Sequence, residues 1–262
     1  MSETLDFDGL DQESQAALER LVLTLADTKR LMGIRYSDWT IGAPTIETGI
    51  SAASMCQDEW GHARLLYAMF KRMGKDPGPY ERDRAAEEYA SVSALDDEAT
   101  DWAAVVALMV LVDGALSAML QAFAEGTFEP ARKRVPKMLA EEEFHASLGA
   151  AWYRRLAASE GEARDLLTAA TQRMLPDLLA WVGTDDEGYR RMTDAGVIED
   201  AEARSSRFKD EVRSLTALVD VDIDAVAPTS EWDAARSRTP GRPNDEAVQR
   251  ARGDLNRALF VE

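Results

Sequence analysis

The feature that most constrains the fold is helical periodicity. Apolar residues recur three and four positions apart along nearly all of the 262 residues, and strand-like alternation is almost absent. Clusters of glycine and proline interrupt the pattern and mark the turns. The sequence therefore predicts an all-α protein with four long helices, over about residues 14–39, 45–72, 101–124 and 131–158.

The four long helices form two predicted hairpins, which suggests a four-helix bundle core. The acidic segment 80–99 should connect the hairpins as a short helix and a loop, and two or more helices should fill about 162–222. We expect one helical domain over residues 1–225. Residues 226–262 should form a charged tail, in which 245–259 could form a short helix.

The composition of the chain excludes several classes of partner and of site. The formal net charge of −18 opposes binding to nucleic acid or to anionic lipid. There is no uncharged apolar stretch of about 18 residues, and the N-terminus is acidic, so we expect neither a membrane span nor a signal peptide. The single cysteine, Cys56, excludes a disulfide within the chain and a cysteine-based zinc site. We expect a cytoplasmic protein in which Cys56 is a small core residue rather than a nucleophile.

The basic residues are 24 arginines and six lysines. An acidic, lysine-poor surface is expected of a protein from a salt-rich cytoplasm, and equally of an ordinary acidic protein that favours arginine. Melting the protein in low and in molar KCl tests the first interpretation, because no gain in stability with salt would rule it out.

The chain contains only two histidines, and each follows a glutamate by three positions. The pairs are Glu59 with His62 and Glu142 with His145. Residues i and i+3 share a helix face, so each pair can present a carboxylate oxygen and an imidazole nitrogen to one point. Both pairs interrupt apolar stripes that should face the core, where a carboxylate needs a partner. A surface ion pair therefore explains them poorly, and a metal site explains them well.

A third acidic residue joins the second pair. Asp113 lies on the apolar face of the third long helix, and antiparallel packing about a turn near residue 128 puts residue 113 level with residue 143. We therefore expect Asp113, Glu142 and His145 to converge. Two Glu-x-x-His helices with acidic residues from the other helices form the layout of di-iron and di-manganese carboxylate proteins. The mixed ligands suit iron, manganese or zinc.

Several stretches resemble the phenylacetic acid catabolic family, the ferritin-like subunits of a multicomponent phenylacetyl-CoA epoxidase. Within residues 15–225 they include Asp38-Trp39 with Gly42-Ala43-Pro44-Thr45, Gln57-Asp58-Glu59-Trp60-Gly61-His62-Ala63, Leu111-Val112-Asp113-Gly114-Ala115 and Glu141-Glu142-Glu143-Phe144-His145. The resemblance implies a ferritin-like four-helix bundle core with additional C-terminal helices. It also implies a di-iron-type oxygenase whose metal ligands are Glu59, His62, Asp113, Glu142 and His145.

The sixth ligand position departs from the family pattern. Ten residues before Trp39, where the family has a glutamate, this chain has Lys29. Asp27 is about 200° away around the helix and cannot simply replace the glutamate. Lys29 would either balance charge or stabilise a reactive oxygen intermediate, and we expect it to be the catalytic residue of the site.

The charge balance leaves several states of the site open. Four carboxylates would balance two divalent irons, whereas three carboxylates with a protonated Lys29 balance one divalent metal. A Lys29 made neutral by burial would change this count again. Two protonated histidines would instead balance a site without metal. We therefore expect two iron ions, or one because Lys29 replaces a carboxylate, with manganese as an alternative metal, and a metal-free core stays open.

The favoured function is a metal-dependent oxygenase subunit that acts on an aromatic acyl-CoA such as phenylacetyl-CoA. It would need a sister ferritin-like subunit and an electron-supplying reductase, and we expect a homo- or heterodimer. The alternative from another class is a non-catalytic structural partner subunit, in which the polar core residues form only an ion-pair network. Other oxidase chemistry or metal storage on the same bundle is a third alternative.

Overall fold

The computed structural model describes residues 7–259, which are helical apart from turns, loops and one isolated β-bridge between Asp233 and Arg238. The described residues contain no strand, which confirms the predicted all-α class. The first six residues of the acidic N-terminal stretch lie outside the described residues, as do the last three of the segment 226–262.

The chain divides into two compact units. One comprises Met1–Leu18 and Ala99–Trp232, and we call it the His145 unit. The other comprises Glu19–Glu98 and Asp233–Glu262, and we call it the His62 unit. Each unit therefore contains one of the two Glu-x-x-His pairs.

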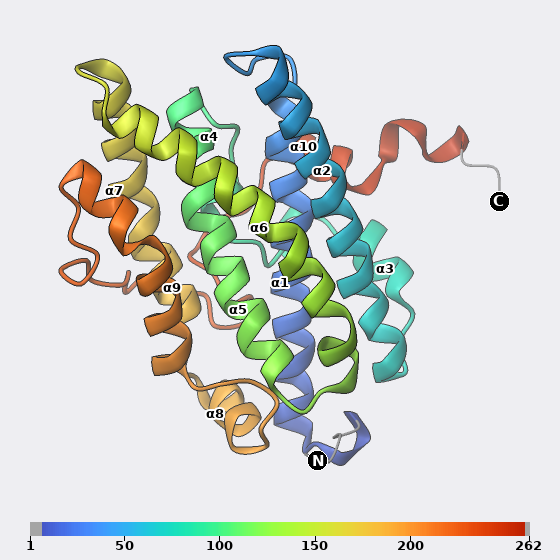
Figure 1. Ribbon diagram of the computed structural model, residues 1–262. Coiled ribbons are helices and arrows are strands. Elements are labelled where there is room, and N and C mark those ends of the chain that lie inside the picture. The colour runs from blue at the N-terminus through green and yellow to red at the C-terminus, as the bar shows by residue number, and fades with distance from the viewer. Residues whose placement is uncertain (1–6, 260–262) are drawn as a thin grey trace. The chain divides into compact units, whose positions relative to one another are not determined.

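The His62 unit consists of a helix hairpin and several short helices (Figure 1). Residues 19–38 of α1 form the first arm of the hairpin, and α2 forms the second. In chain order the elements are α1 (Gln12–Asp38), α2 (Ile46–Tyr67), η2 (Ala68–Met73), α3 (Pro77–Arg82), η3 (Ala86–Glu88), η4 (Ser93–Leu95), α10 (Asp245–Arg252) and η7 (Asp254–Leu259). The connecting segment predicted over 80–99 is thus the end of one short α-helix followed by two 3₁₀ turns.

Local chemistry explains the hairpin of the His62 unit. Thr45 caps α2, because its side chain accepts a hydrogen bond from the backbone N–H of Thr48. The two arms approach closely at Gly33 of α1, where an added Cβ would lie 2.3 Å from Cδ1 of Trp60 on α2. A side chain at residue 33 would push the arms apart, so glycine fixes how closely the two helices pack.

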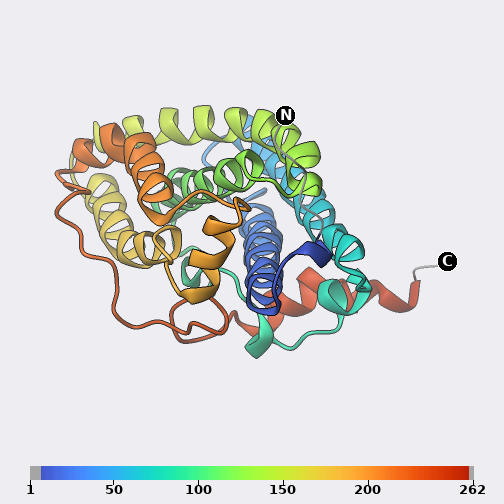
Figure 2. The same ribbon diagram turned by 90° about the horizontal axis from the view of Figure 1, so that it is seen from below.

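The C-terminal segment of the His62 unit is held by arginine side chains. Arg250 on α10 donates to Asp38 at 2.6 Å and to the hydroxyl of Ser37 at 2.8 Å, at the end of α1. Arg252 donates to the backbone carbonyl oxygen of Arg84 at 2.9 Å. Figure 2 shows this red segment beside the blue α1 and the teal α3.

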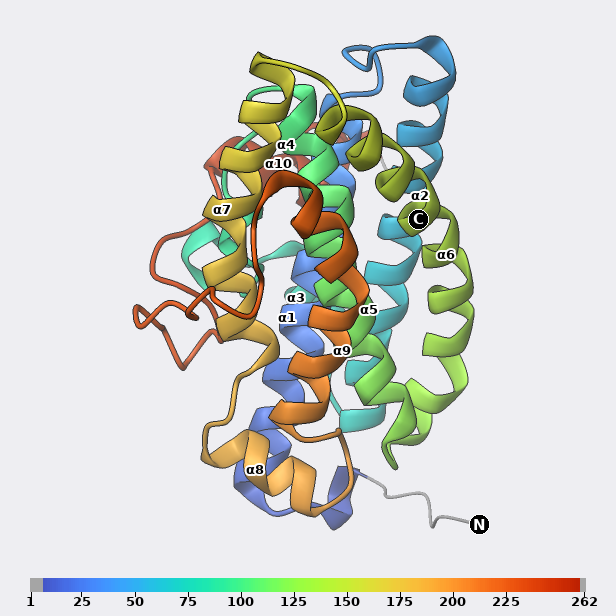
Figure 3. The same cartoon turned by 60° about the vertical axis from the view of Figure 1, so that its left-hand side comes forward.

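The His145 unit packs several helices around one apolar helix. Helix α5 lies between α6 and α9, and α4 packs against α7 (Figure 3). In chain order the elements are η1 (Phe7–Gly9), α4 (Trp102–Ala107), η5 (Leu108–Val112), α5 (Asp113–Glu125), α6 (Glu129–Ala157), α7 (Glu162–Val182), α8 (Glu187–Asp194), α9 (Ala201–Thr216) and η6 (Ala217–Val219). The prediction of two or more helices within 162–222 is confirmed.

The third predicted long helix differs from a regular α-helix. The sequence predicts an unbroken helix over 101–124, but η5 is a π-helical stretch between α4 and α5. A π turn accommodates an additional residue, and such turns are frequent at functional sites. Asp113 is the first residue of α5, directly after this stretch. The change in helical phase therefore sets the direction of Asp113.

The same region is the most apolar part of the described chain. By length and composition, Trp102–Glu125 could cross a membrane, but its most apolar window is 94% buried within the protein. Burial of this extent is typical of the core helix of a soluble protein.

Candidate metal centre

In the His62 unit, the first Glu-x-x-His pair is joined by the lysine of α1. Glu59 and His62 lie on α2 and are both buried, as their place on its apolar stripe predicts. The Nζ atom of Lys29 donates a hydrogen bond to Oε1 of Glu59 at 2.8 Å, and neither side chain has exposed surface. We call Lys29, Glu59 and His62 the His62 half-site. A lysine thus lies where the family pattern has a carboxylate.

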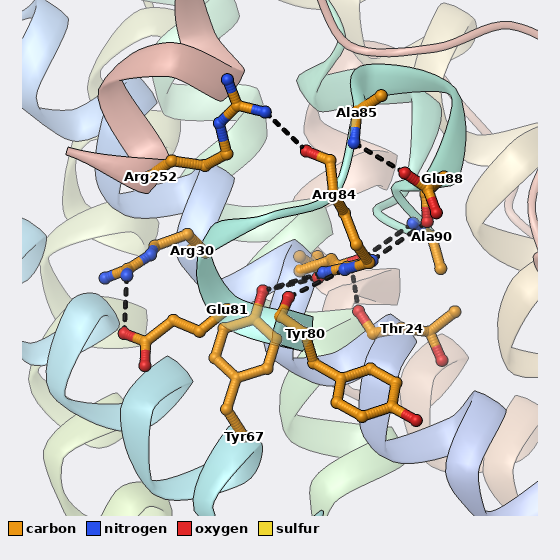
Figure 4. Close-up of polar contacts among 12 residues, drawn as sticks. Thr24, Arg30, Tyr67, Tyr80, Glu81, Arg84, Ala85, Glu88, Ala90 and Arg252 are labelled. Atoms are coloured by element: carbon orange, nitrogen blue, oxygen red, sulfur yellow. Dashed lines mark hydrogen bonds and ion pairs between the residues drawn. The ribbon is translucent and has the colours of Figure 1, made fainter. Parts of the chain in front are cut away.

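Asp27, two residues before Lys29, belongs to a separate network, of which Figure 4 labels Tyr67, Arg84 and Ala90. Its carboxylate accepts hydrogen bonds from the Tyr67 hydroxyl at 2.5 Å, from both terminal nitrogens of Arg84, and from the backbone N–H of Ala90 at 2.8 Å. Burial and then the charge of Asp27 raise the pKa of Tyr67 well above its usual value, which keeps this donor protonated. The carboxylate is therefore committed to holding the fold, and Asp27 does not replace the missing ligand.

In the His145 unit, the second pair meets the aspartate that was predicted to join it. Nδ1 of His145 lies 3.5 Å from Oε2 of Glu142 and 3.7 Å from Oδ2 of Asp113. All three side chains are buried, and one ligand atom of each lies within 4.8 Å of the other two. We call these three residues the His145 half-site. Their predicted convergence is confirmed.

The donor set of the His145 half-site fits a metal ion. Two carboxylates and an imidazole suit divalent iron, manganese or zinc. A buried site with two carboxylates is costly unless positive charge neutralises them, and a divalent cation supplies that charge while it also accepts the imidazole nitrogen. The cluster could therefore hold a metal ion.

A cavity of about 130 Å³ lies beside the His145 half-site. Asp113 and Glu142 line it, together with Arg154 of α6 and Glu211 of α9. The Cδ atom of Glu211 lies 3.7 Å from the position that a Cβ would take on Gly114. Although Glu211 is exposed as a residue, its carboxyl group is largely desolvated, and this, followed by the charges of Asp113 and Glu142, raises the pKa of Glu211 to about 7.

Comparison with protein-family models gives a match described as phenylacetic acid catabolic protein, over residues 1–238. The chain belongs to the phenylacetic acid catabolic protein family. The match spans both Glu-x-x-His pairs and Asp113, and it confirms the family indicated by the sequence motifs. Membership in a family of subunits of a multicomponent complex implies partner subunits. A search of curated proteins gives no match.

The motifs of the phenylacetic acid catabolic family do not draw attention to Glu211. Its neighbours Phe208, Val212 and Leu215 are buried on α9, which packs against α5. Glu211 follows Phe208 by three positions, so it borders this apolar face. An acidic residue at the border of a buried stripe is usually solvated, and only the position of α9 beside α5 distinguishes Glu211.

Cys56 lies one turn before Glu59 on α2 and is buried. Loss of hydration and then the charge of Glu59 raise the pKa of the Cys56 thiol to about 11. The thiolate is therefore scarce near neutral pH, which supports a packing role for Cys56 in this member of the phenylacetic acid catabolic family.

Proposed function

We propose that this protein is a metal-dependent, di-iron-type oxygenase subunit that acts on an aromatic acyl-CoA such as phenylacetyl-CoA. Membership in the phenylacetic acid catabolic family supports the pathway. The single observation that carries the proposal is the buried convergence of Asp113, Glu142 and His145, with ligand atoms within 4.8 Å of one another. This arrangement supports a metal ion as the cofactor.

In this proposal the chain has the ferritin-like bundle implied by its family, and the metal ligands are Glu59, His62, Asp113, Glu142 and His145. When bound, the metal supplies the redox chemistry with dioxygen. The carboxylates neutralise the charge of the metal, and the histidines fix its position through neutral nitrogen atoms. Lys29 holds the Glu59 carboxylate in place through their hydrogen bond, and it lowers the positive charge that the site can accept.

A non-catalytic partner subunit is the second candidate, and the ion pair between Lys29 and Glu59 favours it. A carboxylate that is 2.8 Å from a buried ammonium group has less need of a metal ion. In this alternative, the polar residues of the core preserve the fold and a docking surface, and the sister subunit carries the reaction.

Metal stoichiometry separates the two candidates. The full chain would be produced with iron and manganese supplied, and its metal content measured by elemental analysis. Two irons per chain would support a complete di-iron oxygenase, and one would support an oxygenase-type site in which Lys29 has replaced a carboxylate. No metal on a chain with an intact helical circular dichroism spectrum would favour the partner subunit. Activity on phenylacetyl-CoA would then be assayed with the sister subunit and reductase present.

The variant Lys29→Glu tests whether lysine limits metal binding. It restores a carboxylate at the sixth position, so we expect a higher metal content per chain than in the unaltered protein. Lys75→Glu is the matched control, because it makes the same change of charge at a partly exposed lysine of the same unit. An unchanged metal content in Lys29→Glu would argue against lysine as the obstacle.

A further inference from the structure

A carboxylate that no motif predicts lines the cavity beside the His145 half-site. Glu211 lines the same cavity as Asp113 and Glu142, although it lies on α9, 69 residues after Glu142 in the chain. Buried Phe208 and Val212 fix this side of α9 against α5. The packing of the apolar face thus brings the carboxylate to the metal centre.

Glycine at residue 114 makes room for this approach. A Cβ there would lie 3.2 Å from Cγ1 of Val212 and 3.7 Å from Cδ of Glu211. Because Gly114 follows Asp113 directly, the space that it leaves open adjoins the first carboxylate of the cluster. The Glu211 carboxylate stands at the cavity wall, and rotation about its three side-chain torsions would turn it inward without moving the backbone.

The cavity has room for this rotation. Its volume of about 130 Å³ is several times the share of liquid volume that one water occupies, which is about 30 Å³. A metal ion, the turned carboxylate and one or two waters fit within that space. The remaining lining is largely small or apolar, and it does not compete for the metal.

The charges around the cavity point to one divalent cation. With all carboxylates ionised, the charges of Asp113, Glu142 and Glu211 exceed that of Arg154 by two. One divalent ion neutralises this excess. In the His62 half-site, Lys29 and Glu59 neutralise each other, so that half-site attracts a cation less strongly.

We propose that Glu211 is a further ligand of the metal centre, which binds one divalent ion together with Asp113, Glu142 and His145. The inference rests on the proposed function, because it requires that the centre hold a metal. Glu211 thereby supplies, from α9, a carboxylate in place of the one that Lys29 removes from α1.

The test is a titration of the full chain, stripped of metal by a chelator, with Co²⁺ alone, followed by its visible absorption bands. We expect about one Co²⁺ per chain in the unaltered protein. Glu211→Gln should weaken binding by at least about tenfold and change the absorption bands, since loss of a ligand or its direct support typically costs 10–100-fold in affinity. Glu202→Gln, an exposed residue of the same helix, should alter the affinity by less than about twofold.

The melting temperature of the metal-free proteins is the control for correct folding of the variants. Because Glu211→Gln removes a negative charge from an acidic cavity, its metal-free melting temperature should equal or exceed that of the unaltered protein. Gly114→Ala provides a second variant, since its methyl group would press on Val212 and shift the turn of α9 that carries Glu211, while every carboxylate is kept; we expect weaker Co²⁺ binding there as well.

The outcomes distinguish the two levels of the proposal. Tight Co²⁺ binding with unaltered absorption bands in Glu211→Gln would overturn the role of Glu211 and leave the proposed metal-dependent function intact. Absence of Co²⁺ binding by the unaltered chain would overturn the proposed function, and the role of Glu211 with it.

Discussion

The His62 and His145 half-sites share the Glu-x-x-His spacing but differ in net charge. In the first, the ammonium group of Lys29 lies 2.8 Å from Glu59, and the pair is neutral. In the second, Asp113 adds a second carboxylate beside Glu142, and a cavity lined by a further glutamate adjoins them. The spacing within a helix therefore orients the ligands, whereas the neighbouring helix decides whether a pair needs a cation from outside.

The two half-sites also differ in how accessible they are from solvent. The Lys29 and Glu59 side chains have no exposed surface, whereas Asp113 and Glu142 line a cavity whose wall includes the exposed residues Arg154 and Glu211. A metal ion that enters from solvent would meet carboxylates first on the side of the His145 half-site. The comparison therefore predicts unequal contributions of the two motifs to metal binding.

Removal of the lysine should have the largest effect. Lys29→Met leaves the Glu59 carboxylate without the ammonium group that neutralises it, so the free energy of unfolding of the metal-free protein should fall by about 3–5 kcal/mol. Urea denaturation followed by circular dichroism measures the loss. Recovery of most of it in the double variant Lys29→Met/Glu59→Gln would assign the effect to the pair.

Lys75→Met is the matched control for the lysine variant. Its ion pair with Glu19 belongs to the same unit but is partly exposed, so its loss should cost less than about 1 kcal/mol. Similar losses of stability in the two lysine variants would show that the Lys29 pair is no more important to folding than a surface ion pair.

The second effect concerns the histidines. His145→Gln should lower the affinity for Co²⁺ by about 10–100-fold, because it removes a nitrogen donor from the half-site that lacks the lysine. His62→Gln should lower the affinity less. Isothermal titration of both variants measures the ratio, and equal losses would contradict the proposed asymmetry between the half-sites.

The smallest expected effect concerns the reactivity of Cys56, which lies on α2 together with Glu59 and His62. With a pKa of about 11, only about one thiol in a thousand is ionised at pH 8, so alkylation of the folded protein should be slow. The rate should rise about tenfold per pH unit until the pH approaches 11, since the thiolate is the reactive form. The urea-unfolded chain is the control. Rapid alkylation at pH 8 without unfolding would show that the thiol is neither buried nor near a negative charge.

Sequence pattern could predict much of the fold and of the site because both follow helical periodicity. The apolar stripes placed Glu59 and His62 on inward faces, and the hairpin register brought Asp113 level with residue 143, next to Glu142. These are relations within one helix or between helices joined by a short turn. Such relations depend on the number of residues between two positions.

Other parts of the site depend on packing between distant segments. Glu211 reaches the cavity because α9 lies on α5, and periodicity does not specify which helices touch. Asp27 forms a network with Tyr67 and Arg84, and this network could be predicted only if the course of the chain after α3 were known. The π-helical stretch was missed because its apolar residues satisfy α-helical periodicity equally well.

That π-helical stretch, Leu108–Val112, makes α4 and α5 two helices on one axis with different rotational phase. Because a π turn holds one residue more than an α-helical turn, deletion of one residue within the stretch would leave a regular α-helix in which α4 and α5 keep their present faces. The segment would stay helical and apolar, and the fold would survive. The additional residue thus changes the backbone only next to Asp113, and one codon is enough to add or remove it while the packing of the core stays as it is.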